Sequence, residues 1–145
     1  MSFSWGKGDV YGDRVGEHVW RDQVPLKRLL RAGLTVGCGS DWGPKNPWEH
    51  IQLAETHEFC GSGHRNDTVD HALTREESLL TWTRDAGRVI GRSDTGCLSD
   101  GQKADFIIVD RDPGSCPLDD LSATRVLATA VGGRFVHNTG VDALS

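Results

Sequence analysis

The sequence lacks the features that mark several large classes of protein. No stretch of its 145 residues approaches the roughly 20 apolar residues that a membrane-spanning helix needs. The first residues do not follow the basic-then-apolar pattern of a secretory signal, so we expect a cytoplasmic protein. Lysine and arginine number 16 against 21 aspartate and glutamate residues, which gives a net charge of −5. Because nucleic-acid-binding surfaces usually carry an excess of basic residues, neither nucleic acid nor membrane is an expected partner.

Several catalytic and redox motifs are also missing. The four cysteines show no CxxC pair, and because disulfide frameworks belong mainly to small secreted chains, reduced thiols are expected. Ser40 is not set in a Gly-x-Ser-x-Gly nucleophile elbow, and the glycines at 37 and 39 fall short of a dinucleotide-binding fingerprint. With 37% hydrophobic and 26% charged residues, the composition is that of a globular domain.

The amino-terminal third predicts one helix followed directly by one strand. Residues 1–23 show no clear period, which predicts a loop with at most a short helix. Residues 25–33 predict a helix that begins near Pro25 and ends at Gly33. The apolar run 34–39 then predicts a strand that is buried on both faces.

The remaining elements change from helical to β-rich after residue 92. Asn46 is the predicted cap of one helix, and a capping box at Thr74 predicts another that runs to about residue 90. Residues 104–110 predict a strand. Two further apolar runs flank a Gly-Gly dipeptide over residues 126–137, which is typical of a β-hairpin.

The predicted strand 34–39 has no predicted neighbour within residues 1–92. Unpaired backbone amides inside a protein cost free energy, so a buried strand needs partners on its edges. The first part of the chain therefore resembles the end of a larger β/α structure. Because exposed strand edges also favour association, self-association through such edges is a candidate partner interaction.

Four segments carry a collinear family resemblance over about residues 24–138. They are PLKRLLRAGLTVGCGSDWGPKNPWEHIQLAETH, LTREESLLTWTRDAGRVIG, GCLSDGQKADFIIVDRDP and VLATAVGGRFVH. Together they resemble the carboxyl-terminal portion of the metal-dependent amidohydrolase superfamily, in particular the branch of N-substituted formamide deformylases. The resemblance implies an α/β fold. Residues 1–92 would be the last strand and helices of an incomplete (β/α)8 barrel, and residues 93–145 the strands of a small β-sandwich.

The resemblance also implies a chemistry and a site. It implies hydrolysis of C–N bonds in small-molecule amides or formamides by metal-activated water, with zinc as the expected divalent metal. In the family the eighth strand ends in an aspartate, and Asp41 stands at that position, which implies a metal ligand and catalytic proton-transfer base. The family's His-x-His pair and its other ligands have no counterpart here. Because a catalytic zinc usually takes three protein ligands, we expect a fragment that is inactive alone.

Each candidate residue also has a structural interpretation. Without the resemblance, Asp41 is most simply a turn or cap residue. Trp42 and Trp48 flank that turn and are candidates for the walls of a substrate pocket, or for packing against helices. For the whole chain, the alternative to an enzyme fragment is a non-catalytic remnant or protein-interaction piece.

One further set of residues has side chains of the metal-ligand type. It consists of His57, Cys60, His64 and His71. The spacing is compatible with a structural zinc ion, but the set lacks a second close pair, and Gly61-Ser62-Gly63 is typical of a mobile loop. A polar surface loop is the favoured interpretation.

Overall fold

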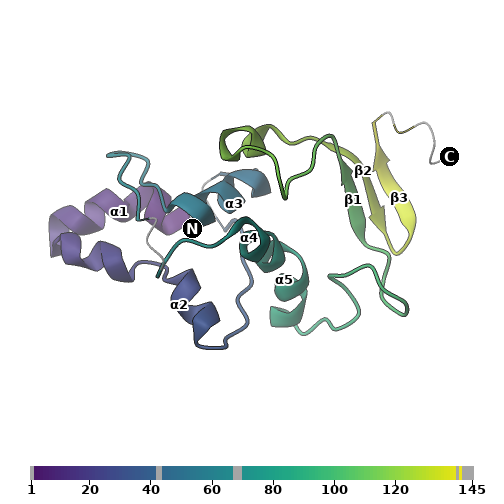
Figure 1. Ribbon diagram of the computed structural model, residues 1–145, viewed down its shortest axis with the longest axis horizontal. Coiled ribbons are helices and arrows are strands. Elements are labelled where there is room, and N and C mark those ends of the chain that lie inside the picture. Colours follow the sequence, from purple (N-terminus) through teal and green to yellow (C-terminus); the bar gives the residue numbers. More distant parts are fainter. Residues whose placement is uncertain (1, 42–43, 67–69, 140, 142–145) are drawn as a thin grey trace.

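The computed structural model of the chain describes residues 2–41, 44–66, 70–139 and 141. Helices α1 to α5 occupy one end and the middle of the molecule, and a three-stranded sheet lies at the other end (Figure 1). Within these ranges no helix is both long and apolar enough to cross a bilayer. The arrangement confirms the predicted change from helices to strands along the chain.

The amino-terminal segment differs from the predicted loop. It forms α1 (Ser2–Val15) and the 3-10 helix η1 (Glu17–Asp22). A glycine in α1 allows an aromatic ring to lie against the backbone, since a Cβ on Gly8 would come within 2.6 Å of the Phe59 ring. Trp20 Nε1 donates a hydrogen bond to the Gly8 carbonyl at 2.8 Å. The prediction was wrong because tertiary packing stabilises a helix of poor intrinsic propensity.

The next segment confirms the predicted helix but not the predicted strand. Helix α2 (Leu26–Arg31) is followed by Gly33, whose φ of +78° ends the helix in the left-handed region. Residues 34–40 have no assigned strand structure. Within this segment, the Cys38 N–H donates a hydrogen bond of 2.9 Å to the Thr81 carbonyl. A strand requires a ladder of such bonds, and no neighbouring strand in the described part of the chain supplies one.

Two helices begin at the predicted caps. Helix α3 (Pro47–Thr56) begins after Asn46, whose side-chain oxygen accepts a hydrogen bond from the Trp48 N–H at 3.1 Å. Helix α4 (Arg75–Trp82) begins after Thr74, where both bonds of the capping box are formed. These short-range signals therefore place the starts of the two central helices.

The second of these helices ends earlier than predicted. Thr83 leaves the helical region, with φ −121° and ψ −99°, and separates α4 from α5 (Arg84–Val89). The Thr83 hydroxyl donates to the Leu79 carbonyl at 2.8 Å. A threonine side chain that binds the backbone in this way competes with continuation of the helix.

The strands form one antiparallel sheet in the order β1-β2-β3. They are β1 (Phe106–Val109), β2 (Val126–Val131) and β3 (Arg134–Asn138). Gly132 and Gly133 join β2 to β3 with φ values of +57° and +77°. Two consecutive positive φ angles suit the tight turn of a two-residue hairpin, so the predicted hairpin is confirmed.

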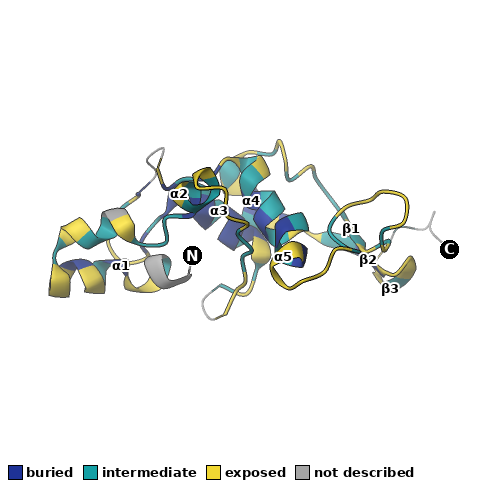
Figure 2. Ribbon diagram, turned by 90° about the horizontal axis from the view of Figure 1, so that it is seen from below, coloured by how far each residue is buried: buried dark blue, intermediate teal, exposed yellow. Residues whose placement is uncertain are grey.

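Buried side chains are concentrated in the centre of the molecule, where α3 and α4 pack together (Figure 2). Ile51 of α3 and Leu121 of the 3-10 helix η2 (Leu118–Ala123) are almost completely buried in one cluster. Leu26 and Ala54 belong to a second cluster that joins α2 to α3. Helix α3 therefore contributes to both clusters and connects the two halves of the chain.

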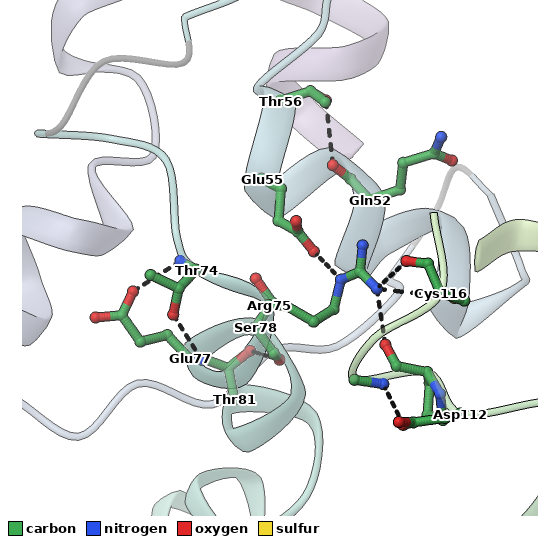
Figure 3. A network of polar contacts seen from close by, with 12 residues as sticks. Gln52, Glu55, Thr56, Thr74, Arg75, Glu77, Ser78, Thr81, Asp112 and Cys116 are labelled. Atoms are coloured by element: carbon green, nitrogen blue, oxygen red, sulfur yellow. Dashed lines mark hydrogen bonds and ion pairs between the residues drawn. The ribbon is translucent and has the colours of Figure 1, made fainter. Parts of the chain in front are cut away.

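Arg75 ties these elements together through polar contacts (Figure 3). Its guanidinium forms an ion pair with Glu55 of α3, and both side chains are mostly buried. Its Nη1 also donates to the carbonyls of Pro113 at 2.7 Å and Cys116 at 3.2 Å. One side chain thus joins α4, α3 and the segment between β1 and η2.

The capping box gives a direct test of this account. We expect Thr74→Ala to lower the free energy of unfolding by about 1 kcal/mol, because α4 loses the side-chain acceptor for a backbone N–H at its start. Urea unfolding followed by far-UV circular dichroism measures the change. The matched control is Thr35→Ala, at an exposed position outside any helix, which should have little effect. Equal stability of the two variants would contradict the prediction.

Candidate functional site

Asp41 lies in the turn between α2 and α3. Its φ of +47° falls in the left-handed region, which aspartate adopts more readily than most residues. The turn is held on both sides, by the bond from the Cys38 N–H to a carbonyl of α4 and by His50, whose Nε2 contacts the Pro44 carbonyl at 2.6 Å. Asp41 itself is exposed. The fold therefore presents an exposed carboxylate on an anchored turn.

The structure does not bring Asp41 and Trp48 into one pocket. Trp48 is 9% exposed and packs with Ile51 and Leu121. It also lines a mainly apolar cavity of about 820 Å³ between α3, α4 and the sheet, and Asp41 is not among the lining residues. Trp42, the other predicted pocket residue, lies outside the described residues. A role of either tryptophan in a substrate pocket stays a prediction.

The described residues do not assemble a metal site around Asp41. Within the described ranges, no three His, Cys, Asp or Glu side chains are placed so that they could share a metal ion. A catalytic zinc usually takes three protein ligands, and a single exposed carboxylate does not replace them. The described residues by themselves therefore do not fit a resident catalytic metal.

The predicted surface loop of metal-ligand residues is divided by the fold. His57 and His71 are each 1% exposed and lie edge to face, with 5.7 Å between their ring centroids. Cys60 is exposed, and His64 lies 4.5 Å from the Trp20 ring. The surface interpretation is wrong for His57 and His71, because their two rings pack against each other in the interior. The structure does not gather the four residues into a zinc-binding set in the part of the chain that it describes.

His57 occupies an unusual position for a titratable residue. It follows the end of α3 in the left-handed region, with φ +49°. Neither ring nitrogen has a hydrogen-bond partner within the described residues. Burial, reinforced by the nearby His71, lowers the pKa of His57 to about 4. The ring is therefore neutral near pH 7, and no motif in the sequence indicated this.

Comparison with known sequences gives a consistent set of relatives. The sequence profile of the Amidohydrolase family matches residues 1–137. The N-substituted formamide deformylase of Arthrobacter pascens is 30% identical over 92% of this chain and 24% of its own length. A 5-methylthioadenosine/S-adenosylhomocysteine deaminase of Pelotomaculum thermopropionicum is 37% identical over 72% of this chain and 24% of its own length. The chain thus spans about a quarter of the length of these relatives.

A solved structure shows the same relationship. It is a mutant of atrazine chlorohydrolase TrzN from Arthrobacter aurescens TC1, complexed with zinc and atraton. It matches this chain with a TM-score of 0.56 and 26% sequence identity. The similarity covers 79% of this chain and 28% of the chlorohydrolase chain.

The buried His57 predicts a dependence of stability on acid. The unfolded chain binds a proton at His57 near pH 6.5, whereas the folded chain does so only near pH 4. The contribution of the neutral ring is therefore fully present above pH 6.5 and is lost as the pH falls toward 4. We expect a loss of about 3 kcal/mol from this group, measured by urea unfolding at a series of pH values.

The matched variant for this measurement is His57→Asn, because asparagine tolerates the left-handed conformation and does not titrate. Carboxylates titrate in both proteins, so the difference between the two pH profiles isolates His57. We expect the variant to lose less stability between pH 6.5 and 4 than the parent chain. Parallel profiles would show that His57 does not titrate as the structure indicates.

Proposed function

Since this chain belongs to the amidohydrolase family, we propose that it is the carboxyl-terminal part of an enzyme that hydrolyses C–N bonds outside peptide backbones. The observation that carries the proposal is the family match along residues 1–137. Among the relatives, a formamide deformylase and a deaminase by name act at bonds between carbon and nitrogen. The proposed substrate is a small-molecule amide or formamide.

The proposed architecture is the end of a (β/α)8 barrel in residues 1–92 and the strands of a small β-sandwich in residues 93–145. The order of elements supports this, because α1 to α5 precede residue 92 and all described strands follow it. In this architecture the segment 34–40, which forms no strand with the described residues, would pair with strands from other residues of the complete protein. Active sites of such barrels lie at the carboxyl ends of the strands, where Asp41 follows this segment.

We assign to Asp41 the roles of metal ligand and proton-transfer base in the complete enzyme. Its exposure on an anchored turn supports this role, because a ligand must be held in place and remain accessible. Zinc is the proposed ion, by analogy with the chlorohydrolase complex. The other ligands would come from residues that this chain does not bring to Asp41. No catalytic step is therefore assigned to the chain by itself.

An activity assay tests both parts of the proposal. We expect the purified 145-residue chain, supplied with zinc, to bind less than one zinc per chain and to show no turnover of an N-substituted formamide. When the chain is joined to an upstream polypeptide that carries a His-x-His pair, we expect amine release. Asp41→Asn should reduce that rate by about a hundredfold or more, because a general base typically contributes 10²–10⁴.

The control for this assay is Asp100→Asn, which removes the same charge at an exposed position near a loop glycine. It should retain the rate of the parent. Loss of activity only in the Asp41 variant supports the assigned role, and equal activity of both variants overturns it. Turnover by the 145-residue chain alone, abolished by Asp41→Asn, would refute the proposal that the remaining ligands lie elsewhere.

A second candidate function is that of a protein-interaction piece. The sheet ends in two edge strands, β1 and β3, and each exposes apolar side chains. Ile107 of β1 is 46% exposed and Val136 of β3 is 51% exposed. Exposed strand edges with apolar residues favour pairing with another strand, which supports self-association of this chain.

Size-exclusion chromatography distinguishes this candidate from a compact monomer. We expect a concentration-dependent oligomer for the parent chain, and a shift toward monomer for Val136→Lys, because an edge lysine opposes strand pairing. The control Val89→Lys adds the same charge to an exposed position of α5 and should leave the oligomer intact. A parent chain that is monomeric at every concentration would rule out self-association.

A further inference from the structure

A pocket between α5 and the loop that leads to β1 gathers three arginines. They are Arg84, Arg88 and Arg92, which recur at intervals of four residues and line a cavity of about 470 Å³. Cavities of about 300–1,000 Å³ are typical of small-ligand sites. Arg84 and Arg88 lie on α5 and Arg92 follows the end of that helix. Like charges this close to one another repel, so such a cluster requires compensating anions. The pocket is separate from Asp41, which is not among its lining residues.

The remaining lining residues are neutral. They are Gly91, Ser93, Thr95, Cys97 and Gln102. No carboxylate is among the lining residues, although the chain as a whole carries a net charge of −5. Guanidinium, hydroxyl and amide groups together match the acceptor oxygens of an oxyanion. The chemistry of the wall therefore selects an anionic ligand.

Two carboxylates hold the arginines in place from outside the wall. Asp85 is 7% exposed and accepts hydrogen bonds from Arg84 Nε at 2.9 Å and Arg88 Nη1 at 3.2 Å. Asp94 accepts two hydrogen bonds from Arg92, from Nε at 2.8 Å and from Nη2 at 3.2 Å. A guanidinium carries five N–H donors, so these contacts use only part of each group. The buried Asp85 thus orients two arginines and leaves donors for a ligand.

Other charges around the pocket do not enter it. Glu76 interacts electrostatically with Arg84, and Asp105 interacts with Arg92. Lys103 adds a further positive charge through its ion pair with Asp94 at 3.1 Å. None of these three residues lines the cavity. A ligand inside the pocket would therefore contact the arginines and none of these three side chains.

The arginines indicate the kind of anion. A guanidinium presents paired N–H donors that match two oxygens of a phosphate group. The hydroxyls of Ser93 and Thr95 and the amide of Gln102 add neutral polar groups to the wall. A phosphate group therefore fits the residues that line the cavity.

We propose that this pocket binds a phosphate group, either free or as the end of a small phosphomonoester. The inference rests on the three arginines that line the cavity and on the absence of a carboxylate among its described lining residues. It does not depend on the proposed hydrolysis at Asp41, because the two sites share no residue. The pocket would be a second ligand site on the surface of α5, where exposed positions are visible in Figure 2.

Isothermal titration calorimetry of the 145-residue chain tests the proposal. Inorganic phosphate and adenosine monophosphate are titrated separately, in chloride buffer of constant ionic strength. We expect saturable binding at one site by at least one of them. Arg88→Gln and Arg92→Gln should each raise the dissociation constant about tenfold or more, because each removes a charged hydrogen-bond donor. Both side chains are about half exposed, so the fold should tolerate their replacement.

The matched control is Arg134→Gln, which removes the same charge from an exposed position of β3. Its dissociation constant should stay within about twofold of the parent value. Circular dichroism of every variant checks that the fold is retained. Binding of phosphate alone identifies a free-anion site, and tighter binding of the nucleotide identifies a phosphomonoester site. Absence of saturable binding by either, or equal weakening by all three variants, overturns the proposal.

Discussion

The arrangement of this chain depends on the contacts of one partly buried arginine. Arg75 begins α4, pairs with Glu55 of α3, and donates to the carbonyls of Pro113 and Cys116 beyond β1. Burying a guanidinium costs free energy unless its N–H donors are paired. Arg75 therefore depends on the acceptors that Glu55, Pro113 and Cys116 supply. The ion pair therefore joins α4 to α3, and the two hydrogen bonds join these helices to the segment that follows β1. The apolar clusters on α3 then pack around this fixed junction.

A second constraint acts on the backbone before Asp41. The segment 34–40 is held to α4 by the N–H of Cys38, yet no described strand lies beside it. None of its residues is buried, so the prediction of a strand buried on both faces is not met in this structure. The barrel interpretation therefore calls for neighbours from other residues to pair its backbone groups. The anchored turn after this segment exposes Asp41. A single carboxylate can act in catalysis only when neighbouring groups complete the site. The described residues thus hold Asp41 in place without completing a metal site around it.

Charge is distributed unevenly over an acidic molecule. Asp41 is exposed on its turn, whereas three arginines line one cavity, and Asp85 accepts hydrogen bonds from two of them, Arg84 and Arg88. Such clustering against the sign of the net charge requires specific partners, and a buried carboxylate is an effective one. His57 differs from these ion-paired groups, because burial lowers its pKa and keeps its ring neutral near pH 7. Asp85 is thus buried with paired arginines, whereas His57 is buried without a hydrogen-bond partner among the described residues.

The sequence by itself determined the features that depend on neighbouring residues. The capping box at Thr74, the stop at Gly33 and the hairpin turn at residues 132–133 are short-range patterns, and the structure confirms each of them. Family resemblance identified Asp41 as the candidate ligand, but not its surroundings. Only the tertiary structure decided that residues 2–15 form a helix, that His57 faces His71, and that arginines converge beside Gln102. These features depend on contacts between side chains far apart in the sequence, which no local pattern encodes.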